Sequence, residues 1–359
     1  MTAHPSAADP ARDPSLWAEA LPRDRPVLVT GAAGFIGSAV AERLLRAGIA
    51  VVGVDNLNAY YDPALKADRL ARIADLPGFT FRQIDLADRD GIAALFGEFR
   101  FAHVVHLAAQ AGVRHSIENP FAYAESNLTG FLAILEGCRA ARTAHLVYAS
   151  SSSVYGGNLQ APFATDHGAD HPVSLYAATK RANELMAHAY ADLYASPATG
   201  LRFFTVYGRW GRPDMAVWLF TDAVLHDRPI KVFNNGVMKR DFTHVDDIVE
   251  GVLRLLPRPP RPDPGFDRAA PRPDRSWAPH RVFNIGNSRA EKLTDLIALI
   301  EAAAGREARK IMLPMQAGDV AETFADISAL TAETGFAPRT TLAEGIPDFV
   351  AWFRERHGL

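Results

Sequence analysis

The stretch that decides the fold class runs from Val27 to Gly48 and reads VLVTGAAGFIGSAVAERLLRAG. It begins with a short apolar run, continues through glycines spaced G-x-x-G-x-x-G, and then repeats apolar residues at helical spacing. The glycines are Gly31, Gly34 and Gly37. Glycine lets the backbone turn sharply and approach a pyrophosphate, while the following helix offers free N–H groups and a partial positive charge. The stretch therefore predicts a strand, a tight turn and a helix that together bind a dinucleotide.

An acidic residue at the end of the next apolar run favours this prediction over its alternative, a tight turn without a ligand. Asp55 follows the run at 51–54 and lies 18 residues after Gly37. A carboxylate there can accept hydrogen bonds from a ribose 2′-hydroxyl and would repel a 2′-phosphate, which favours NAD over NADP. Asp85 follows a later strand, where it suits either adenine binding or the N-cap of a helix. The sequence leaves both interpretations of Asp85 open.

Strands and helices alternate through the first two-thirds of the chain. Further apolar runs at 104–107 and 145–149 alternate with helical patterns such as 126–141. This alternation predicts an α/β fold with a Rossmann-like, doubly wound parallel sheet. The predicted organisation is a disordered N-terminal extension (1–25), a NAD-binding domain (26–208, with segments near 240–256 and 282–287 returning to it) and a smaller C-terminal α/β substrate-binding domain (209–359) with a flexible Pro-rich loop (257–279).

Composition and charge exclude several classes of partner. The formal net charge is -3, which offers no basic face for nucleic acid. No apolar run approaches the roughly 20 residues of a membrane span, so no membrane partner is expected. Cys138 is the only cysteine, which excludes an internal disulfide and fits a cytoplasmic location. His106, His115 and His244 match no metal-ligand spacing, so no metal is expected.

A tyrosine and a lysine one helical turn apart point to acid–base chemistry on a hydroxyl group. Tyr176 and Lys180 lie in SLYAATKRANEL, where a helical pattern places them on one face. A free tyrosine has a pKa near ~10, and a lysine ammonium and the positive nicotinamide ring of NAD would lower it toward that of a general base. Such a pair occurs by chance on many helices. It gains weight from four serines, 150–153, which end an apolar strand 25 residues upstream.

These residues resemble the extended short-chain dehydrogenase/reductases, and within them the UDP-glucuronate 4-epimerases. The motifs that carry the resemblance are GAAGFIG, DNLNAYYD, HLAAQAGVRHS, NLTGF, ASSSSVYG, HPVSLYAATKRANELMAH, LRFFTVYGRWGRPDM and KRDFTHVDDIVEG. They extend from about Val27 to the C-terminus, apart from 257–279. Arg209 departs from the pattern, since such enzymes more often have proline there. The resemblance implies NAD-dependent inversion at C4 of a UDP-uronic acid, UDP-glucuronate to UDP-galacturonate, through a transient 4-keto sugar.

The same resemblance implies a role for individual residues. The catalytic set would be Ser151, Tyr176 and Lys180. A tightly bound, recycled NAD would contact Gly31, Gly34, Phe35, Ile36, Gly37, Asp55, Asn56, Asp85, Leu86, Leu107, Ala108, Ala109, Tyr176 and Lys180. The UDP-sugar would contact Arg114, Ser151, Ser152, Ser153, Thr205, Arg212, Arg240 and Asp319. The enzyme would be a homodimer, formed through the helix at 126–141 and the helix that carries Tyr176.

Three alternatives stay open. UDP-glucuronate decarboxylases and sugar dehydratases of the same fold resemble this chain but carry carboxylates near the catalytic hydroxyl, where this chain has Ser152 and Ser153. A 4-epimerase for a neutral UDP-hexose is disfavoured only if Thr205 and Arg212 face the sugar, because a guanidinium and a hydroxyl suit a carboxylate. A NAD-binding regulator without catalytic activity would not need the Ser–Tyr–Lys set.

Overall fold

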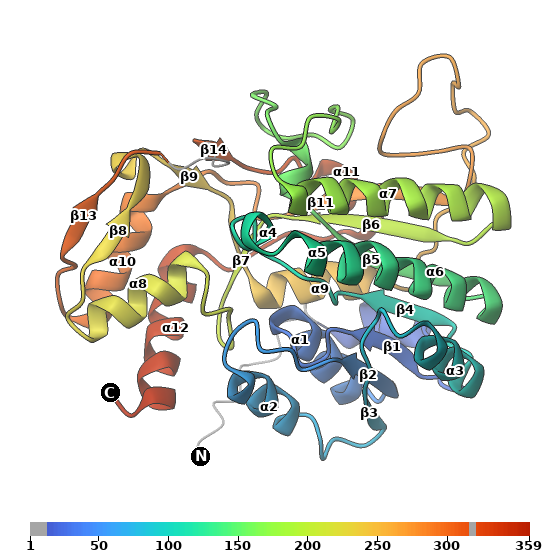
Figure 1. Ribbon diagram of the computed structural model, residues 1–359, viewed down its shortest axis with the longest axis horizontal. Helices are drawn as coiled ribbons and strands as arrows, with labels where there is room; N and C mark the ends of the chain where they lie inside the picture. The colour runs from blue at the N-terminus through green and yellow to red at the C-terminus, as the bar shows by residue number, and fades with distance from the viewer. Residues whose placement is uncertain (1–12, 316–320) are drawn as a thin grey trace.

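The N-terminal lobe is built on a parallel sheet of seven strands in the order β11-β6-β5-β4-β1-β2-β3 (Figure 1). The computed structural model describes residues 13–315 and 321–359. The strands are β1 (Val27–Thr30), β2 (Val51–Asp55), β3 (Phe79–Gln83), β4 (His103–His106), β5 (His145–Ser151), β6 (Ala198–Phe203) and β11 (His280–Ile285). The strand order reverses between β1 and β4, which is the point where open α/β sheets bind ligands.

Helices cover both faces of this sheet, as predicted for a doubly wound fold. One face packs against α1 (Phe35–Arg46), α9 (Val245–Leu255) and α11 (Ser328–Thr334). The other packs against α3 (Arg89–Phe99), α6 (Gly130–Ala141) and α7 (Leu175–Tyr194). Successive residues of β1 serve the two faces in turn, because side chains alternate along a strand. Strands buried on both faces explain the unbroken apolar runs of the sequence.

A smaller C-terminal lobe has a core of its own (Figure 1). Its elements are α8 (Ala216–Leu225), β8 (Ile230–Val232), α10 (Leu293–Ala304), β13 (Lys310–Met312) and α12 (Leu342–His357). Short strands join the lobes: β7 (Thr205–Tyr207) pairs with β10 (Phe242–His244), and β9 (Lys239–Arg240) pairs with β12 (Glu291–Lys292) and β14 (Glu322–Thr323). The other helix of some length in the described residues is α2 (Pro63–Ala71). The shorter helical segments are η2 (Pro14–Leu16), η3 (Ala18–Ala20), α4 (His115–Glu118), α5 (Pro120–Tyr123), η4 (Ala124–Thr129), η5 (Ser152–Tyr155) and η6 (Phe233–Gly236).

The N-terminal segment corrects one expectation. Composition predicts disorder through residue 25, but Trp17 is fully buried and packs with Leu21 in the core beside α1. Arg23 donates from Nη1 to the carbonyl oxygens of Ala47 (3.0 Å) and Gly48 (2.9 Å), which lie just beyond the C-terminus of α1. The Trp17 ring and the Arg23 guanidinium therefore hold this segment against the lobe, although its polar, Pro-containing composition predicts disorder.

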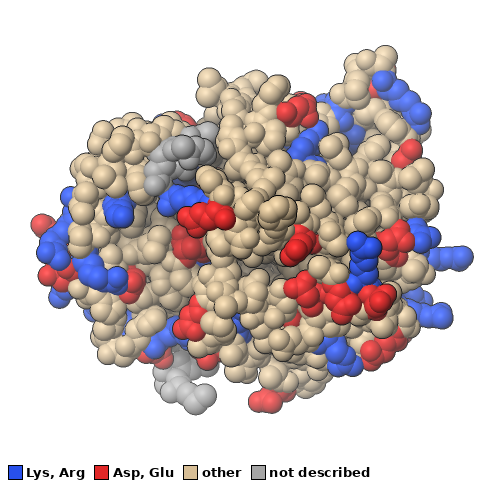
Figure 2. Space-filling model, in the orientation of Figure 1, with Lys and Arg blue, Asp and Glu red and all other residues tan. Residues whose placement is uncertain are grey.

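The loop at 257–279 contains no helix or strand and extends from the body of the lobe (Figure 1). Its second half is fastened to α7, because Trp277 donates from Nε1 to Asp192 at 2.5 Å and Arg268 lies 4.1 Å from the Trp277 ring centroid. Figure 2 shows Lys and Arg side chains interspersed with Asp and Glu side chains over the face in view. On this face the charges therefore alternate rather than gather by sign, in keeping with the small net charge.

A buried ion pair lies directly beneath the end of β5. Glu184 on α7 accepts from Nε and Nη2 of Arg202 on β6, both at 2.9 Å, and neither side chain is exposed to solvent. Glu184 also accepts from the Ser150 hydroxyl at 2.6 Å and from Arg181 at 2.8 Å. Burial alone would raise the pKa of Glu184, but the two arginines and Ser150 outweigh it and lower that pKa to about 2.

We predict that Glu184→Gln lowers the free energy of unfolding at neutral pH by about 3–5 kcal/mol, because it leaves the buried Arg202 charge unpaired. The folded-state pKa of Glu184 is depressed, so its stabilisation is present above its ordinary pKa of about 4.3 and is lost as pH falls from there toward about 2. Urea unfolding across pH 2 to 7, a range of about 5 units that includes this window, would measure both effects. The variant should lose part of the acid sensitivity of the wild type.

The matched control is Glu98→Gln, which removes the partner of Arg82 in an ion pair that is about half exposed. Exposed pairs contribute at most about 1 kcal/mol. Equal effects of the two substitutions would contradict the importance assigned to the buried pair.

Candidate functional site

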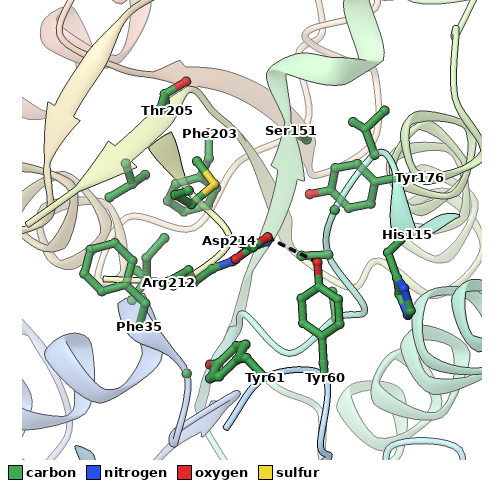
Figure 3. A pocket seen from close by; sticks show the side chains of 18 of the residues that line it. Phe35, Tyr60, Tyr61, His115, Ser151, Tyr176, Phe203, Thr205, Arg212 and Asp214 are labelled. Carbon is green, nitrogen blue, oxygen red and sulfur yellow. Dashed lines mark hydrogen bonds and ion pairs between the residues drawn. The ribbon is translucent and has the colours of Figure 1, made fainter. Parts of the chain in front are cut away.

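A cavity of about 1000 Å³ lies between the two lobes, at the carboxyl ends of the central strands (Figure 3). All fourteen cofactor contacts that the sequence implies line it, together with seven of the eight substrate contacts. The eighth, Asp319, lies outside the described residues. The loops after β1, β2, β4 and β5 supply one wall, and the segments around β7, α8 and β8 supply the other. Residues far apart in the chain thus meet in a single cavity.

The turn between β1 and α1 accepts only glycine at two of its positions. Gly31 has φ +73°, a left-handed conformation, and a Cβ there would lie 2.9 Å from the backbone nitrogen of Ala108. A Cβ on Gly37 would lie 2.0 Å from the carbonyl oxygen of Gly31. The first turn of α1 therefore closes tightly on the end of β1, and its N–H groups face the cavity that Gly34, Phe35 and Ile36 line. This geometry fits a pyrophosphate at a helix N-terminus.

The end of β2 presents an anchored carboxylate. Asp55 accepts from the backbone nitrogens of Ala33 (3.2 Å) and Leu57 (2.9 Å). Lys66, buried on α2, places Nζ 3.7 Å from Asp55 and donates to Asn58 at 2.8 Å. The carboxylate is thus fixed at the position where a ribose diol would be recognised in this fold.

The N-cap interpretation of Asp85 is wrong, because Asp88 caps the following helix α3, while adenine binding stays a prediction. One oxygen of Asp85 accepts from the backbone nitrogen of Ala87 at 2.9 Å, within a turn. The other accepts from Asn56 Nδ2 at 2.8 Å, which draws it toward the loop after β2. Leu86 follows it into the cavity lining. The residue therefore organises the cavity wall as well as its own turn.

Ser151 and Tyr176 face the same part of the cavity (Figure 3). Ser151 ends β5 and accepts from the backbone nitrogen of Ser153 at 3.2 Å, while Tyr176 lies in the first turn of α7, which Ser174 caps. Burial raises the pKa of Tyr176, and the Ser151 hydroxyl and the Arg212 guanidinium oppose that rise. The protein groups alone therefore give a higher pKa, not the lower one that the Tyr–Lys spacing predicts.

The amino group of Lys180 is hydrogen-bonded to the backbone near the end of β5. Its Nζ donates to the carbonyl oxygen of Ala149 at 2.8 Å, and burial lowers its pKa to about 8. Nearby, His106 shares a 2.9 Å hydrogen bond with Thr30, and burial together with the Lys180 charge lowers the His106 pKa to about 3. His106 is thus a neutral core residue beside the lysine at neutral pH.

The serine run lines the cavity and also reaches the core. The Ser150 hydroxyl donates to the buried Glu184, as already described. All four serines line the cavity, and Ser152 and Ser153 begin the 3-10 turn η5. Neutral hydroxyl groups therefore surround Ser151 at the end of β5, where a carboxylate would be needed for elimination chemistry.

The opposite wall carries Thr205 and Arg212. Thr205 begins β7, and Arg212 lies in the loop between β7 and α8 (Figure 3). Arg212 donates from Nε to Asp214 Oδ1 at 3.0 Å and from Nη2 to Asp214 Oδ2 at 2.5 Å. Burial disfavours the charge, but the Asp214 carboxylate outweighs it and raises the pKa of Arg212. The cation is therefore permanent.

Two further arginines line the cavity toward the C-terminal lobe. The Arg114 guanidinium, at the start of α4, lies 5.3 Å from the ring centroid of Phe233, so it crosses from one lobe to the other. Arg240 on β9 donates from Nη1 to the carbonyl oxygen of Lys239 at 2.8 Å. Both cations border the part of the cavity that lies away from the glycine turn.

Several lining residues escaped sequence reasoning. Tyr60, Lys66 and Asp214 all line the cavity, and Tyr60 donates to Asp214 Oδ2 at 3.1 Å across the cavity wall (Figure 3). They stand inside or beside motifs that carry the resemblance, DNLNAYYD and GRWGRPDM. A polar cluster directly after an acidic strand end was the available signal. The spacing alone does not reveal the partner, because 154 residues separate Tyr60 from Asp214.

The unusual Arg209 lies on the same loop as Arg212 but points elsewhere. It forms an ion pair with Asp348 on α12, and neither residue lines the cavity. Arg209 therefore fastens the loop to the C-terminal lobe and adds no charge to the cavity lining. Among residues 13–315 and 321–359, no group of three or more His, Cys, Asp or Glu side chains is placed to hold a metal ion. No helix within those residues is long and apolar enough to cross a membrane.

The chain is similar to known proteins over nearly its whole length. The chain is 47% identical over 337 residues to a probable UDP-glucuronate 4-epimerase of Rhizobium meliloti (strain 1021), which covers 92% of this chain and 97% of that protein. A UDP-glucuronic acid 4-epimerase from Bacillus cereus, solved in complex with UDP-glucuronic acid and NAD, superposes with a TM-score of 0.80 at 30% identity and covers 92% of this chain and 99% of that one. A UDP-glucose 4-epimerase from Thermotoga maritima, solved with UDP-glucose, gives a TM-score of 0.80 at 28% identity with the same coverage of 92% and 99%.

A family model matches residues 27–286 of the chain. This range includes the glycine turn, the serine run at the end of β5 and the helix that carries Tyr176 and Lys180. It contains nearly the whole N-terminal lobe and the loop that carries Arg212. The seven-stranded parallel sheet and its covering helices are those of the solved neighbours. The chain belongs to the NAD dependent epimerase/dehydratase family.

Proposed function

We propose that this protein inverts C4 of UDP-glucuronate to give UDP-galacturonate, with one NAD that stays bound through the cycle. The single observation that carries the proposal is that one cavity holds Ser151 and Tyr176 on one wall and the Arg212 cation on the other (Figure 3). The first pair suits a sugar hydroxyl, and the guanidinium suits a carboxylate on the same sugar. Similarity to a UDP-glucuronic acid 4-epimerase bound to UDP-glucuronic acid and NAD supports the same substrate.

NAD, when bound, supplies a hydride acceptor and donor for C4. The chain supplies the proton path and the geometry. Tyr176 removes the proton of the sugar 4-hydroxyl, Ser151 hydrogen-bonds the same oxygen, and the 4-keto sugar turns over before the proton and hydride return. Lys180, whose pKa burial lowers to about 8, sits one helical turn behind Tyr176. The sugar is thus oriented by side chains from the end of one strand, β5, and from one helix, α7, which makes the reaction effectively intramolecular.

The uronate carboxylate adds a hazard that the site has to control. In the 4-keto sugar this group is β to a ketone, and β-keto acids lose CO₂ when the C5–C6 bond stands perpendicular to the carbonyl plane. Arg212 and Thr205 line the wall where directed hydrogen bonds can hold the carboxylate in another orientation. The uncharged Ser152 and Ser153 favour epimerisation over decarboxylation or dehydration for the same reason: no carboxylate stands beside Ser151 to assist either reaction.

The alternative is a 4-epimerase for a neutral UDP-hexose, since a UDP-glucose 4-epimerase has the same fold. The observation against it is Arg212, a part-buried cation within the electrostatic reach of Tyr176. With a neutral sugar, Arg212 would keep its Asp214 partner, but the N–H donors on its Nη1 side would face no carboxylate. For the nucleotide of the substrate, Arg240 is suited to the pyrophosphate of UDP, and Arg114 is a second candidate for the sugar carboxylate.

The deciding experiment is incubation of the purified protein with UDP-glucuronate and no added NAD, followed by chromatography and NMR of the products. We expect a product of unchanged mass inverted at C4. Tyr176→Phe is the matched control and should lower kcat by about 10²–10⁴-fold, because only the proton-transferring hydroxyl is removed. Turnover of UDP-glucose but not of UDP-glucuronate would replace the proposal by the neutral-hexose alternative.

We predict that Arg212→His shifts the products of UDP-glucuronate from UDP-galacturonate toward loss of CO₂. The shorter imidazole cannot reproduce the fork of hydrogen bonds that holds the carboxylate, and misplacement on the ångström scale changes rates by about 10²-fold. Mass spectrometry of the UDP-sugars together with released CO₂ measures the ratio. A ratio equal to that of the wild type would remove Arg212 from this role.

We also propose that the protein acts as a homodimer through α6 and α7. These helices pack against each other and expose Leu132 on α6 and Leu185 and Leu193 on α7. Light scattering after size-exclusion chromatography should give the mass of two chains, and Leu185→Glu should shift it toward one. A wild-type monomer at micromolar concentration would contradict the dimer. The cytoplasmic location stays a prediction from the single cysteine.

A further inference from the structure

Arg212 is held by a short chain of polar contacts that begins on the cofactor side of the cavity. The Asp214 carboxylate accepts both an Nε and an Nη2 hydrogen bond from Arg212, at 3.0 and 2.5 Å. The Tyr60 hydroxyl donates to the same carboxylate at 3.1 Å (Figure 3). Tyr60 belongs to the loop that begins directly after Asp55, the last residue of β2. The chain of contacts therefore joins the predicted ribose-binding loop to the predicted carboxylate-binding arginine.

The surroundings of Tyr60 fix the position of its hydroxyl. Its ring packs 4.9 Å from the ring of His115 and 5.9 Å from that of Tyr61, measured between centroids. Gly112 has φ +106°, and a Cβ there would lie 2.6 Å from the Tyr60 oxygen. A glycine thus leaves the space that the hydroxyl occupies. The donor is built into the wall rather than resting on it.

The charges of the three groups are settled at neutral pH. Burial and the nearby Asp214 carboxylate raise the pKa of Tyr60 to about 12. The Tyr60 hydroxyl is therefore neutral at neutral pH and donates a hydrogen bond to Asp214. Burial would raise the pKa of Asp214, but the Arg212 guanidinium outweighs it and lowers that pKa. The arrangement is therefore a neutral donor, an anion and a cation in sequence.

We propose that Asp214 and Tyr60 are positioning residues that fix the direction of the Arg212 guanidinium, and that this direction decides whether the 4-keto uronate is epimerised or loses CO₂. This inference rests on the proposed function. Asp214 occupies the Nε–Nη2 edge of the guanidinium. Of the five N–H donors of arginine, those on the Nη1 side are left for a second acceptor. One carboxylate of the protein thereby aims the fork at a carboxylate of the substrate.

The charge of Asp214 shows that the arrangement favours direction over attraction. An anion beside Arg212 weakens the pull of the guanidinium on a negatively charged uronate. If affinity were the only requirement, Arg212 would bind the substrate better without Asp214. What Asp214 contributes is a bidentate, charge-assisted contact with a fixed plane. Its removal should therefore change the fate of the intermediate more than the binding of the substrate.

The backbone of the loop is fastened separately. Arg69, on α2, donates to the carbonyl oxygens of Trp210 (3.0 and 2.7 Å) and Gly211 (2.9 Å), and Arg209 pairs with Asp348 on the far side. Loosening of the loop and rotation of the Arg212 side chain can thus be separated by substitution. Asp348→Asn removes a loop contact outside the cavity, whereas Asp214→Asn removes the contact that orients Arg212.

The unwanted reaction defines the readout. The C5–C6 bond breaks, CO₂ leaves, and the bonding electron pair forms an enolate between C4 and C5 that takes up a proton at C5. The product is a UDP-linked 4-keto pentose or its reduced pentose. Each decarboxylation thus yields one CO₂ and one UDP-sugar of lower mass, and each epimerisation leaves the mass unchanged.

The experiment compares wild type, Asp214→Asn, Tyr60→Phe and Asp348→Asn as holoenzymes with UDP-glucuronate. For each we would measure KM, kcat, melting temperature and the ratio of decarboxylated to epimerised product. We expect Asp214→Asn to raise that ratio by roughly tenfold or more without raising KM, since ångström-scale misplacement has large effects on rate. Tyr60→Phe should act in the same direction but less strongly, and Asp348→Asn should keep the wild-type ratio.

Two results would overturn the proposal: a wild-type product ratio in Asp214→Asn, whatever its KM, or an equal rise of the ratio in Asp348→Asn. If Asp214→Asn does not fold, Tyr60→Phe decides, because it removes one oxygen atom and keeps the packed ring. Failure of the wild type to convert UDP-glucuronate would instead overturn the proposed function, and the positioning role with it.

Discussion

The site depends on Arg69, a fully buried guanidinium that joins the two walls of the cavity. It donates to the carbonyl oxygens of Trp210 and Gly211 in the sugar-side loop, and to Ala33 in the glycine turn at 3.2 Å. The turn that suits a pyrophosphate and the loop that carries Arg212 are therefore held to one another by hydrogen bonds of a single side chain. A cation satisfied by backbone oxygens fixes backbone position, because each bond has a defined direction.

A second buried arginine, Arg202, connects two elements of the N-terminal lobe next to Ser151 and Tyr176. Arg202 and Glu184 tie β6 to α7, and Ser150 at the end of β5 donates to the same carboxylate. Both Ser150 and Ser151 line the cavity, but the Ser150 hydroxyl is hydrogen-bonded to this core pair. The hydroxyl beside Tyr176 is therefore placed by its neighbour in sequence. The hydrogen bond from Ser150 to Glu184 thus fixes the backbone that carries Ser151.

The parts of the protein that could be predicted from the sequence carry local signals. Buried parallel strands read as unbroken apolar runs, and the glycine turn, Asp55 and the Tyr176–Lys180 spacing each lie within a few residues of the element that positions them. The order of residues 14–21 could not be predicted, because it depends on where Trp17 is received in the core. The Tyr60–Asp214 contact could not either, because it joins positions 154 residues apart. Strands of two or three residues show no periodicity at all.

The proposed role of Arg212 separates two tasks of the site. In that proposal, C4 of the sugar meets Ser151 and Tyr176, whose positions are set by β5 and α7. The fate of the proposed intermediate then depends on the other wall, where the direction of the Arg212 guanidinium is fixed by Asp214. The Asp214 anion weakens the attraction of Arg212 for a negatively charged group, but it also fixes the orientation of the guanidinium. In a cavity where a reactive carboxylate has to be held still, definition of geometry matters more than strength of attraction.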